Sequence, residues 1–276
     1  MAEPERSRES RSLSGVPKRR GREGRRRIRI LAAATRVVPP LLLFVALVAS
    51  WHVTVVALAI PEIVLPTPAA VANALVALGP TLLADVAVTG TTAATGLLAG
   101  CAVGGVLAFA MTYSRTAARI ALPYVIALRV APLIAVAPLV FLWFGRGIPA
   151  RAALVATLTL FPMTVATLDG LRSTPERYLA LARSVDASKP SVFLRMRVPA
   201  AAPSVFAGLK LAATLSIVGS VVAEFVTLRA GIGYRVFVTA QRLRTAETYA
   251  ALVALSALGV AFYLVPALLE RALWTE

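Results

Sequence analysis

Residue types that often support catalysis or metal binding are almost absent from this 276-residue chain. Cys101 is the only cysteine, which excludes an intramolecular disulfide and a cysteine-based metal site. His52 is the only histidine, and a lone histidine near the end of an apolar segment is more typical of packing than of ligation. The pattern G-x-x-x-x-G-K-[ST] is also missing, so we predict that this chain binds no ATP, metal or other cofactor.

Charged residues are scarce as well, and long apolar runs take their place. Only 15% of the residues are charged, against about a quarter in an ordinary soluble domain, and 58% are hydrophobic. Because a bilayer leaves every backbone polar group to be satisfied within its own segment, runs near 20 residues predict helices rather than strands. The sequence therefore predicts an all-α integral membrane protein with about six transmembrane helices. The six segments are 37–60, 85–111, 120–144, 152–168, 206–228 and 249–269.

The positive charge is concentrated at the N-terminus, which predicts the orientation. Residues 1–29 contain 11 Lys or Arg against 4 acids, and we expect residues 1–36 to form a disordered cytoplasmic tail that touches anionic lipid rather than nucleic acid. A transmembrane domain then covers residues 37–271, with both termini in the cytoplasm. The predicted outer loop 229–248 counts against this orientation because it holds four arginines.

Two local patterns predict helix packing and a short outer helix. Gly96, Gly100 and Gly104 recur every four residues in the second segment, so a neighbouring helix can approach closely. That neighbour belongs either to a second subunit or to the same bundle, and the sequence does not separate the two. After the first segment, Thr67 and Pro68 are typical of a helix start. We expect a short helix along the outer face to follow.

The cytoplasmic loop 169–205 is too long for a plain connection, and it contains two helix-start signals. Thr174 is predicted to cap a helix that has Glu176 in its first turn and runs to about 186. Pro190 is predicted to start a second short helix, which Pro199 ends. Two short helices projecting from the membrane predict a docking surface for a partner protein. An interfacial segment without a partner is the alternative.

This loop resembles the cytoplasmic loop of the inner-membrane permeases of binding-protein-dependent ABC importers. The pattern of that family is Glu-Ala-Ala, three residues, Gly, nine residues, Ile, one residue, Leu-Pro. Its register falls on Ala180, Leu181, Ala182, Asp186, Met196, Val198 and Pro199. Five blocks resemble the sulfonate, taurine and nitrate branch: 63–70, 138–147, 181–210, 221–225 and 231–234.

The resemblance implies a permease subunit in a bacterial inner membrane. Its coupling loop would dock into a groove on a separate ATPase, which binds ATP and Mg. A second permease copy, identical or related, would complete the path, and an extracytoplasmic substrate-binding protein would deliver a small solute. Sulfonates, taurine or nitrate lead, with vitamin or pyrimidine precursors as alternatives. Ala180 and Asp186 depart from the family pattern; we expect Asp186 to take the left-handed turn that a Gly would otherwise favour.

Four charged residues lie in or beside the apolar segments, where charge is costly and often functional. Asp85 and Lys210 are near segment ends and are predicted to reach the interface. Arg129 and Glu224 lie deeper, and we expect both to flank the pathway, with Arg129 a candidate ligand for an anionic solute. A structural Arg129–Glu224 pair is the alternative.

A secondary transporter and a degenerate partner permease are alternatives to an ABC import permease. A secondary transporter would show inverted repeats, and no clear repeat is visible. A degenerate permease that works only beside a better-matched one would account for Ala180 and Asp186.

Overall fold

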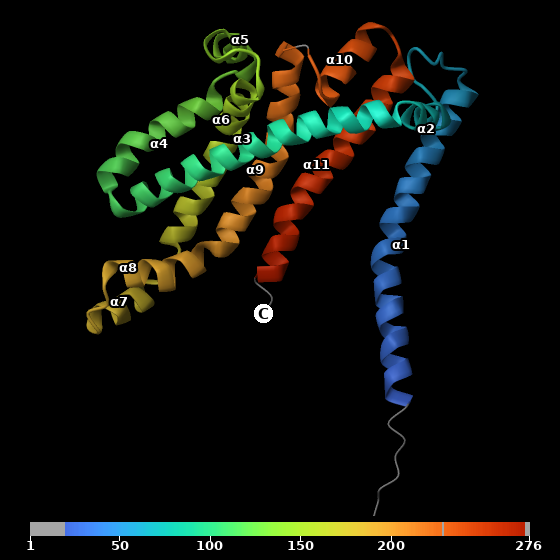
Figure 1. Ribbon diagram of the computed structural model, residues 1–276. Helices are drawn as coiled ribbons and strands as arrows, with labels where there is room; N and C mark the ends of the chain where they lie inside the picture. Colours follow the sequence, from blue (N-terminus) through green and yellow to red (C-terminus); the bar gives the residue numbers. More distant parts are fainter. Residues whose placement is uncertain (1–19, 228, 274–276) are drawn as a thin grey trace, which may run out of the picture. The chain divides into compact units, whose positions relative to one another are not determined.

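The computed structural model describes residues 20–227 and 229–273, and every regular element in those ranges is a helix (Figure 1). The chain divides into two units, one ending at Ala59 and one starting at Ile60. The first unit contains α1 (Arg20–Ala57), which begins inside the segment predicted as a basic tail. Residues 1–19 of that predicted tail lie outside the described residues.

The second unit contains the remaining helices, which follow one another with short connections. They are α2 (Pro68–Ala77), α3 (Gly79–Tyr113), α4 (Arg115–Val130), α5 (Leu133–Phe144), α6 (Ile148–Arg172), α7 (Glu176–Ser184), α8 (Lys189–Val192), the π-helical turn η1 (Phe193–Arg197), α9 (Val198–Thr227), α10 (Ile232–Gln241) and α11 (Thr245–Leu273). Within this unit α7 and α8 lie toward the same end as the last turn of α11, and α5 and α10 lie at the opposite end (Figure 1).

Five helical stretches are long and apolar enough to cross a membrane. They are Val38–Ala57, α3, α6, Lys189–Thr227 and α11, and α4 with α5 makes a sixth if the pair counts as one span. The predicted count of about six is therefore confirmed. The third segment, 120–144, is not one straight helix, however, because α4 and α5 meet at an angle of 102°. Pro132 explains the break: a residue before proline disfavours the helical region, and Ala131 has φ −59° and ψ 129°.

Helices α3, α6 and α9 form the centre of the second unit, and glycines permit their close approach. Gly96, Gly100 and Gly104 are buried and all face α6 of the same chain. A Cβ at Gly100 would lie 2.8 Å from the carbonyl oxygen of Ala156, well inside van der Waals contact. The glycine row is thus placed within one bundle.

The outer helix start agrees with its prediction. Thr67 is the N-cap of α2, and its Oγ1 accepts a hydrogen bond from the N–H of Ala70 at 3.2 Å. Pro68 occupies the first helical position, where its missing N–H costs nothing.

The segment between α6 and α9 differs from its prediction in two places. Thr174 is not a cap: Pro175 holds the N-cap position of α7 without a side-chain hydrogen bond. Pro199 does not end a helix, since α9 starts at Val198 and continues to Thr227. A helical proline clashes with the carbonyl four residues back. The π-helical turn η1 precedes Pro199 and relieves this clash, because its hydrogen bonds join residues five apart instead of four. The N–H of Val198 accordingly donates to the carbonyl oxygen of Phe193.

Candidate functional site

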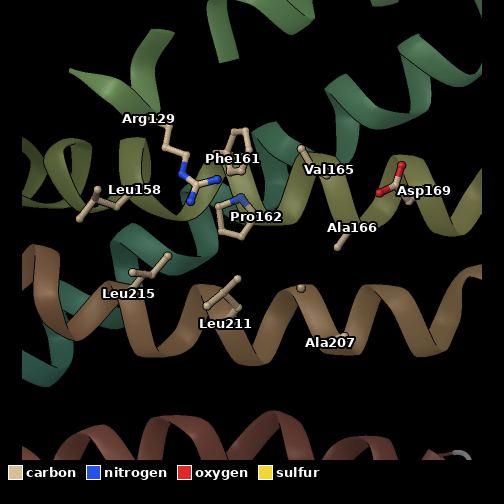
Figure 2. Close-up of a pocket in the computed structure, with 11 residues that line it drawn as sticks. Arg129, Leu158, Phe161, Pro162, Val165, Ala166, Asp169, Ala207, Leu211 and Leu215 are labelled. Carbon is tan, nitrogen blue, oxygen red and sulfur yellow. The ribbon is translucent and has the colours of Figure 1, made fainter. Parts of the chain in front are cut away.

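A cavity of about 580 Å³ opens among α4, α6 and α9, beside the break between α4 and α5. Its walls are mostly apolar, with one positive and one negative side chain among them. The lining consists of Arg129, Leu158, Phe161, Pro162, Val165, Ala166, Asp169, Ala207, Gly208, Leu211 and Leu215. Figure 2 shows Arg129 reaching from α4 toward Phe161, while Asp169 lies further along α6.

Arg129 is positioned by an aromatic ring rather than by an acid. Its guanidinium carbon lies 4.4 Å from the ring centroid of Phe161, a cation–π geometry. Among the described residues it forms no ion pair. A guanidinium stacked on a ring keeps its in-plane N–H groups available, so this arrangement can bind a carboxylate, sulfonate or similar anion.

Glu224 does not line this cavity. It is fully buried on α9, where its Oε2 accepts a hydrogen bond from the N–H of Gly233 at 2.8 Å. The alternative of a direct Arg129–Glu224 pair is not observed, because each side chain has a different neighbour. Of the two candidates for the pathway, Arg129 lines this cavity and Glu224 does not.

Glu224 belongs instead to a set of buried polar side chains that hold the start of α10. Three consecutive N–H groups of the chain each donate to a side chain on another helix. Gly231 donates to Asp85 at 3.4 Å, Ile232 to Thr89 at 2.9 Å and Gly233 to Glu224. The first N–H groups of a helix lack partners within it, so α3 and α9 supply the cap that α10 needs.

Two further contacts show how closely this cap is packed. Asp85 also forms an ion pair with Arg235, one turn into α10. Gly231 has φ +112°, and a Cβ there would collide with the carboxylate of Glu224. The sequence blocks at 221–225 and 231–234 are therefore in contact, and both a positive φ and lack of space require glycine.

Asp85 and Lys210, which are predicted to reach the interface, each form an ion pair within the second unit. Asp85 is 8% exposed and paired with Arg235. Lys210 donates to Glu270 with a distance of 2.7 Å between Nζ and Oε2, which joins α9 to α11. A paired charge inside a helical bundle avoids the desolvation cost that would otherwise drive it toward water.

The predicted coupling residues lie along α7, η1 and the start of α9. Leu181 is 59% exposed and Ala180 is also exposed, whereas Ala182 is 2% exposed and packs inward. Asp186 has φ +50°, the left-handed conformation predicted for it. Further on, Met196 is half-buried, and Val198 and Pro199 are exposed at the first turn of α9.

Three apolar side chains are exposed along α7 and its C-cap, beside exposed charged residues and outside the spanning helices. Tyr178, Leu181 and Val185 are 46%, 59% and 69% exposed. Such a face on a short helix is typical of a surface that fits a groove on another protein. Sequence reasoning found this face, but it missed Phe161, Asp169, Thr89 and Arg235. The carboxylates, thiols and imidazole of the described residues form no cluster suited to a metal ion.

Comparisons with known proteins identify the family of the chain. The family described as binding-protein-dependent transport system inner membrane component matches residues 96–275. A probable ABC transporter permease of Haemophilus influenzae is 32% identical over 241 residues, which cover 87% of this chain and 98% of that protein. The formylaminopyrimidine transport permease ThiX of Halalkalibacterium halodurans is 31% identical and covers 72% of this chain and 80% of its own. The putative aliphatic sulfonates transport permease SsuC of Escherichia coli is 35% identical over 53% of this chain and 56% of its own.

Proposed function

The chain belongs to the family of inner-membrane components of binding-protein-dependent transport systems, and on that premise we propose which of its surfaces serve solute and which serve the ATPase. It is a multi-pass permease subunit of an ABC importer and not an enzyme, as the names of its relatives indicate. The family implies two kinds of partner, a substrate-binding protein and an ATPase.

The cavity at Arg129 is our proposed section of the translocation path. Its apolar walls offer few groups that would hold a solute tightly, and Arg129 offers one positive charge with free donors. That combination suits a small organic anion, such as a sulfonate, that must bind weakly enough to leave. A relative named for aliphatic sulfonates supports this class, and one named for formylaminopyrimidine keeps a pyrimidine precursor as the alternative.

The segment from α7 to the start of α9 is our proposed coupling surface. It combines an exposed apolar face with the positions that match the family's loop, and Leu181 belongs to both. Ala180 stands where the family has an acid, so we expect a docking contact that depends more on apolar burial than on charge. ATP and Mg would be bound by the ATPase partner.

The remaining parts of the assembly follow from the same reading. A second permease copy, identical or related, would cover the open side of the path. The coupling surface and the last turn of α11 lie at one end of the second unit (Figure 1), which fits a cytoplasmic C-terminus. We place both termini in the cytoplasm and the protein in the bacterial cytoplasmic membrane, with the binding protein docking at the end that carries α10.

A change at Leu181 tests the coupling surface. Leu181→Asp puts a charge into the proposed docking face, and we expect retention of the cognate ATPase during purification to fall at least about tenfold, which corresponds to about 1.4 kcal/mol. Leu243→Asp is the matched control, since Leu243 is 63% exposed at the other end of the unit. Equal retention by both variants would exclude this surface as the docking site.

A change at Arg129 tests the path. Arg129→Gln should lower uptake of an anionic solute by reconstituted transporter at least about tenfold, while Arg129→Lys restores part of it because the charge returns. Arg146→Gln removes an exposed arginine outside the cavity and should leave uptake close to wild type. Equal uptake by Arg129→Gln and Arg146→Gln would contradict the assignment.

A further inference from the structure

A second cavity, of about 390 Å³, lies between the end of α3 and the segment α7–η1. Its lining contains three basic side chains, Arg183, Lys189 and Arg197, and no acidic one. Thr112 and Tyr113 also belong to the lining, and the hydroxyl of Thr112 donates to the carbonyl oxygen of Ala108 within α3. Several basic side chains around one hollow are a set that binds a phosphate group.

The charges of this cavity are only partly neutralised by the protein. Arg183 pairs with Glu176 on its own helix, and this pair is largely exposed. Lys189 and Arg197 form no ion pair within the described ranges 20–227 and 229–273. Two of the three cations therefore remain available to a ligand.

An aromatic cluster adjoins the basic cavity where α3 ends. Phe109 and Tyr113 on α3 contact Phe193 of η1, with ring centroids 5.0 Å and 5.5 Å from that of Phe193. Phe109 is 47% exposed and Tyr113 49% exposed, and Tyr113 is shared with the cavity. Aromatic rings at the end of a spanning helix are typical of the boundary between acyl chains and headgroups.

The cavity lies within the segment proposed for coupling, on the side of α7 that packs inward. Its wall on α7 includes Leu179 and the buried Ala182, whereas Tyr178, Leu181 and Val185 point outward. A ligand here would sit between the loop and the bundle, where a lipid at the membrane edge can reach it. A protein docked on the exposed face of α7 would use different side chains.

We propose that this cavity binds the phosphate of an anionic phospholipid. Lys189 and Arg197 hold the phosphate, Tyr113 contributes its hydroxyl, and the rings of Phe109 and Phe193 lie beside the acyl chains. Basic hollows between spanning helices are known sites for anionic headgroups. Phosphate binding follows from the basic residues that line the cavity. Only the position of the cavity at the cytoplasmic leaflet rests on the proposed function. A bound lipid would tie α7–η1 to α3 and stiffen the coupling segment.

Native mass spectrometry of the purified full chain tests the site. The protein is incubated with equal amounts of phosphatidylglycerol and phosphatidylcholine, and retention of each lipid is measured. We expect wild type to prefer phosphatidylglycerol. At about 1 kcal/mol for each basic residue, Lys189→Gln should lower that preference about fivefold and Lys189→Gln with Arg197→Gln about 25-fold. The single variant keeps the test open if the double variant does not fold, because Lys189 is exposed.

The matched control removes two exposed arginines from the same segment outside the cavity, Arg177→Gln with Arg195→Gln. An unchanged preference in this control supports a local site, and an equal loss in both double variants means general attraction and overturns the proposal. If millimolar inorganic phosphate displaces bound lipid and wild type shows no preference between the two lipids, the site binds free phosphate. If the cavity variants keep their lipid preference and lose only retention of the ATPase, the site binds the protein partner. Either result overturns the lipid site without bearing on uptake through the Arg129 cavity.

Discussion

Replacing Gly96 by alanine should destabilise the bundle because the added methyl group has no room. A Cβ at this position would collide with the Cβ and Cγ1 of Val155 and lie 2.9 Å from the carbonyl oxygen of Ala152. Val155 is fully buried, and its Cβ is fixed to the backbone, so no side-chain rotation relieves the contact. Helices α3 and α6 must therefore separate along their seam.

The size of the effect follows from the cost of overpacking. Forcing an extra methyl group into a well-packed core costs about 1–3 kcal/mol. For a chain of this size that corresponds to a fall in melting temperature of about 2–10 °C. Gly105→Ala is the matched control, since nothing lies within 4 Å of a Cβ there and the same helix gains a better helix former. We expect its melting temperature to stay level or rise by a few degrees.

Both variants are measured by thermal denaturation of the detergent-solubilised protein, with size-exclusion chromatography to record the oligomeric state. The reasoning predicts a lower melting temperature for Gly96→Ala alone. Melting temperatures that agree within error would refute it. So would a Gly96→Ala protein that melts normally but has lost self-association, because the glycine row would then pack between subunits.

Three other changes test the contacts at α10 and at the coupling segment. Gly231→Ala should lower the melting temperature at least as much as Gly96→Ala, because its φ of +112° and the adjacent Glu224 both oppose a side chain. A double-mutant cycle of Asp85→Asn and Arg235→Gln, measured by denaturation, should give a coupling energy of at least about 1 kcal/mol, and additivity would argue against the pair. Asp186→Gly should raise the melting temperature slightly, because glycine adopts a φ of +50° without steric strain. The gain in the free energy of unfolding should be at most about 1 kcal/mol.

The sequence predicted those parts of the fold that depend on local pattern. Apolar length located the spans, and Thr67 with Pro68 located the start of α2, because both signals are contained within a few turns of chain. The break at Ala131 was open to the same reasoning, since proline restricts the residue before it. The prediction of one straight segment over 120–144 rests on its apolar length and does not use the restriction that Pro132 places on Ala131.

The buried cap of α10 lay beyond such reasoning. Its N–H donors at 231–233 are 9 to 146 residues from their acceptors along the chain. Neither short block of sequence indicates which distant side chain will accept a hydrogen bond from these N–H groups. The sequence places Glu224 beside the pathway only because a buried acid in a membrane segment usually faces a polar route. The structure places it instead where a helix start needs an acceptor.

Ion pairs in the folded protein do not change how the basic residues of this chain bear on its orientation. Arg235 and Arg244 count as outer positive charges in the sequence, but Arg235 pairs with Asp85 and Arg244 pairs with Glu247. The positive-inside rule counts Lys and Arg and gives Asp and Glu little weight, so these two pairs do not lower the outer total. The basic residues between α6 and α9 are offset less, since only Arg183 among them forms an ion pair within the described residues. The proposed orientation with α7 and α8 in the cytoplasm therefore rests on the larger total of Lys and Arg in the inner segments, which exceeds the four arginines of the outer loop.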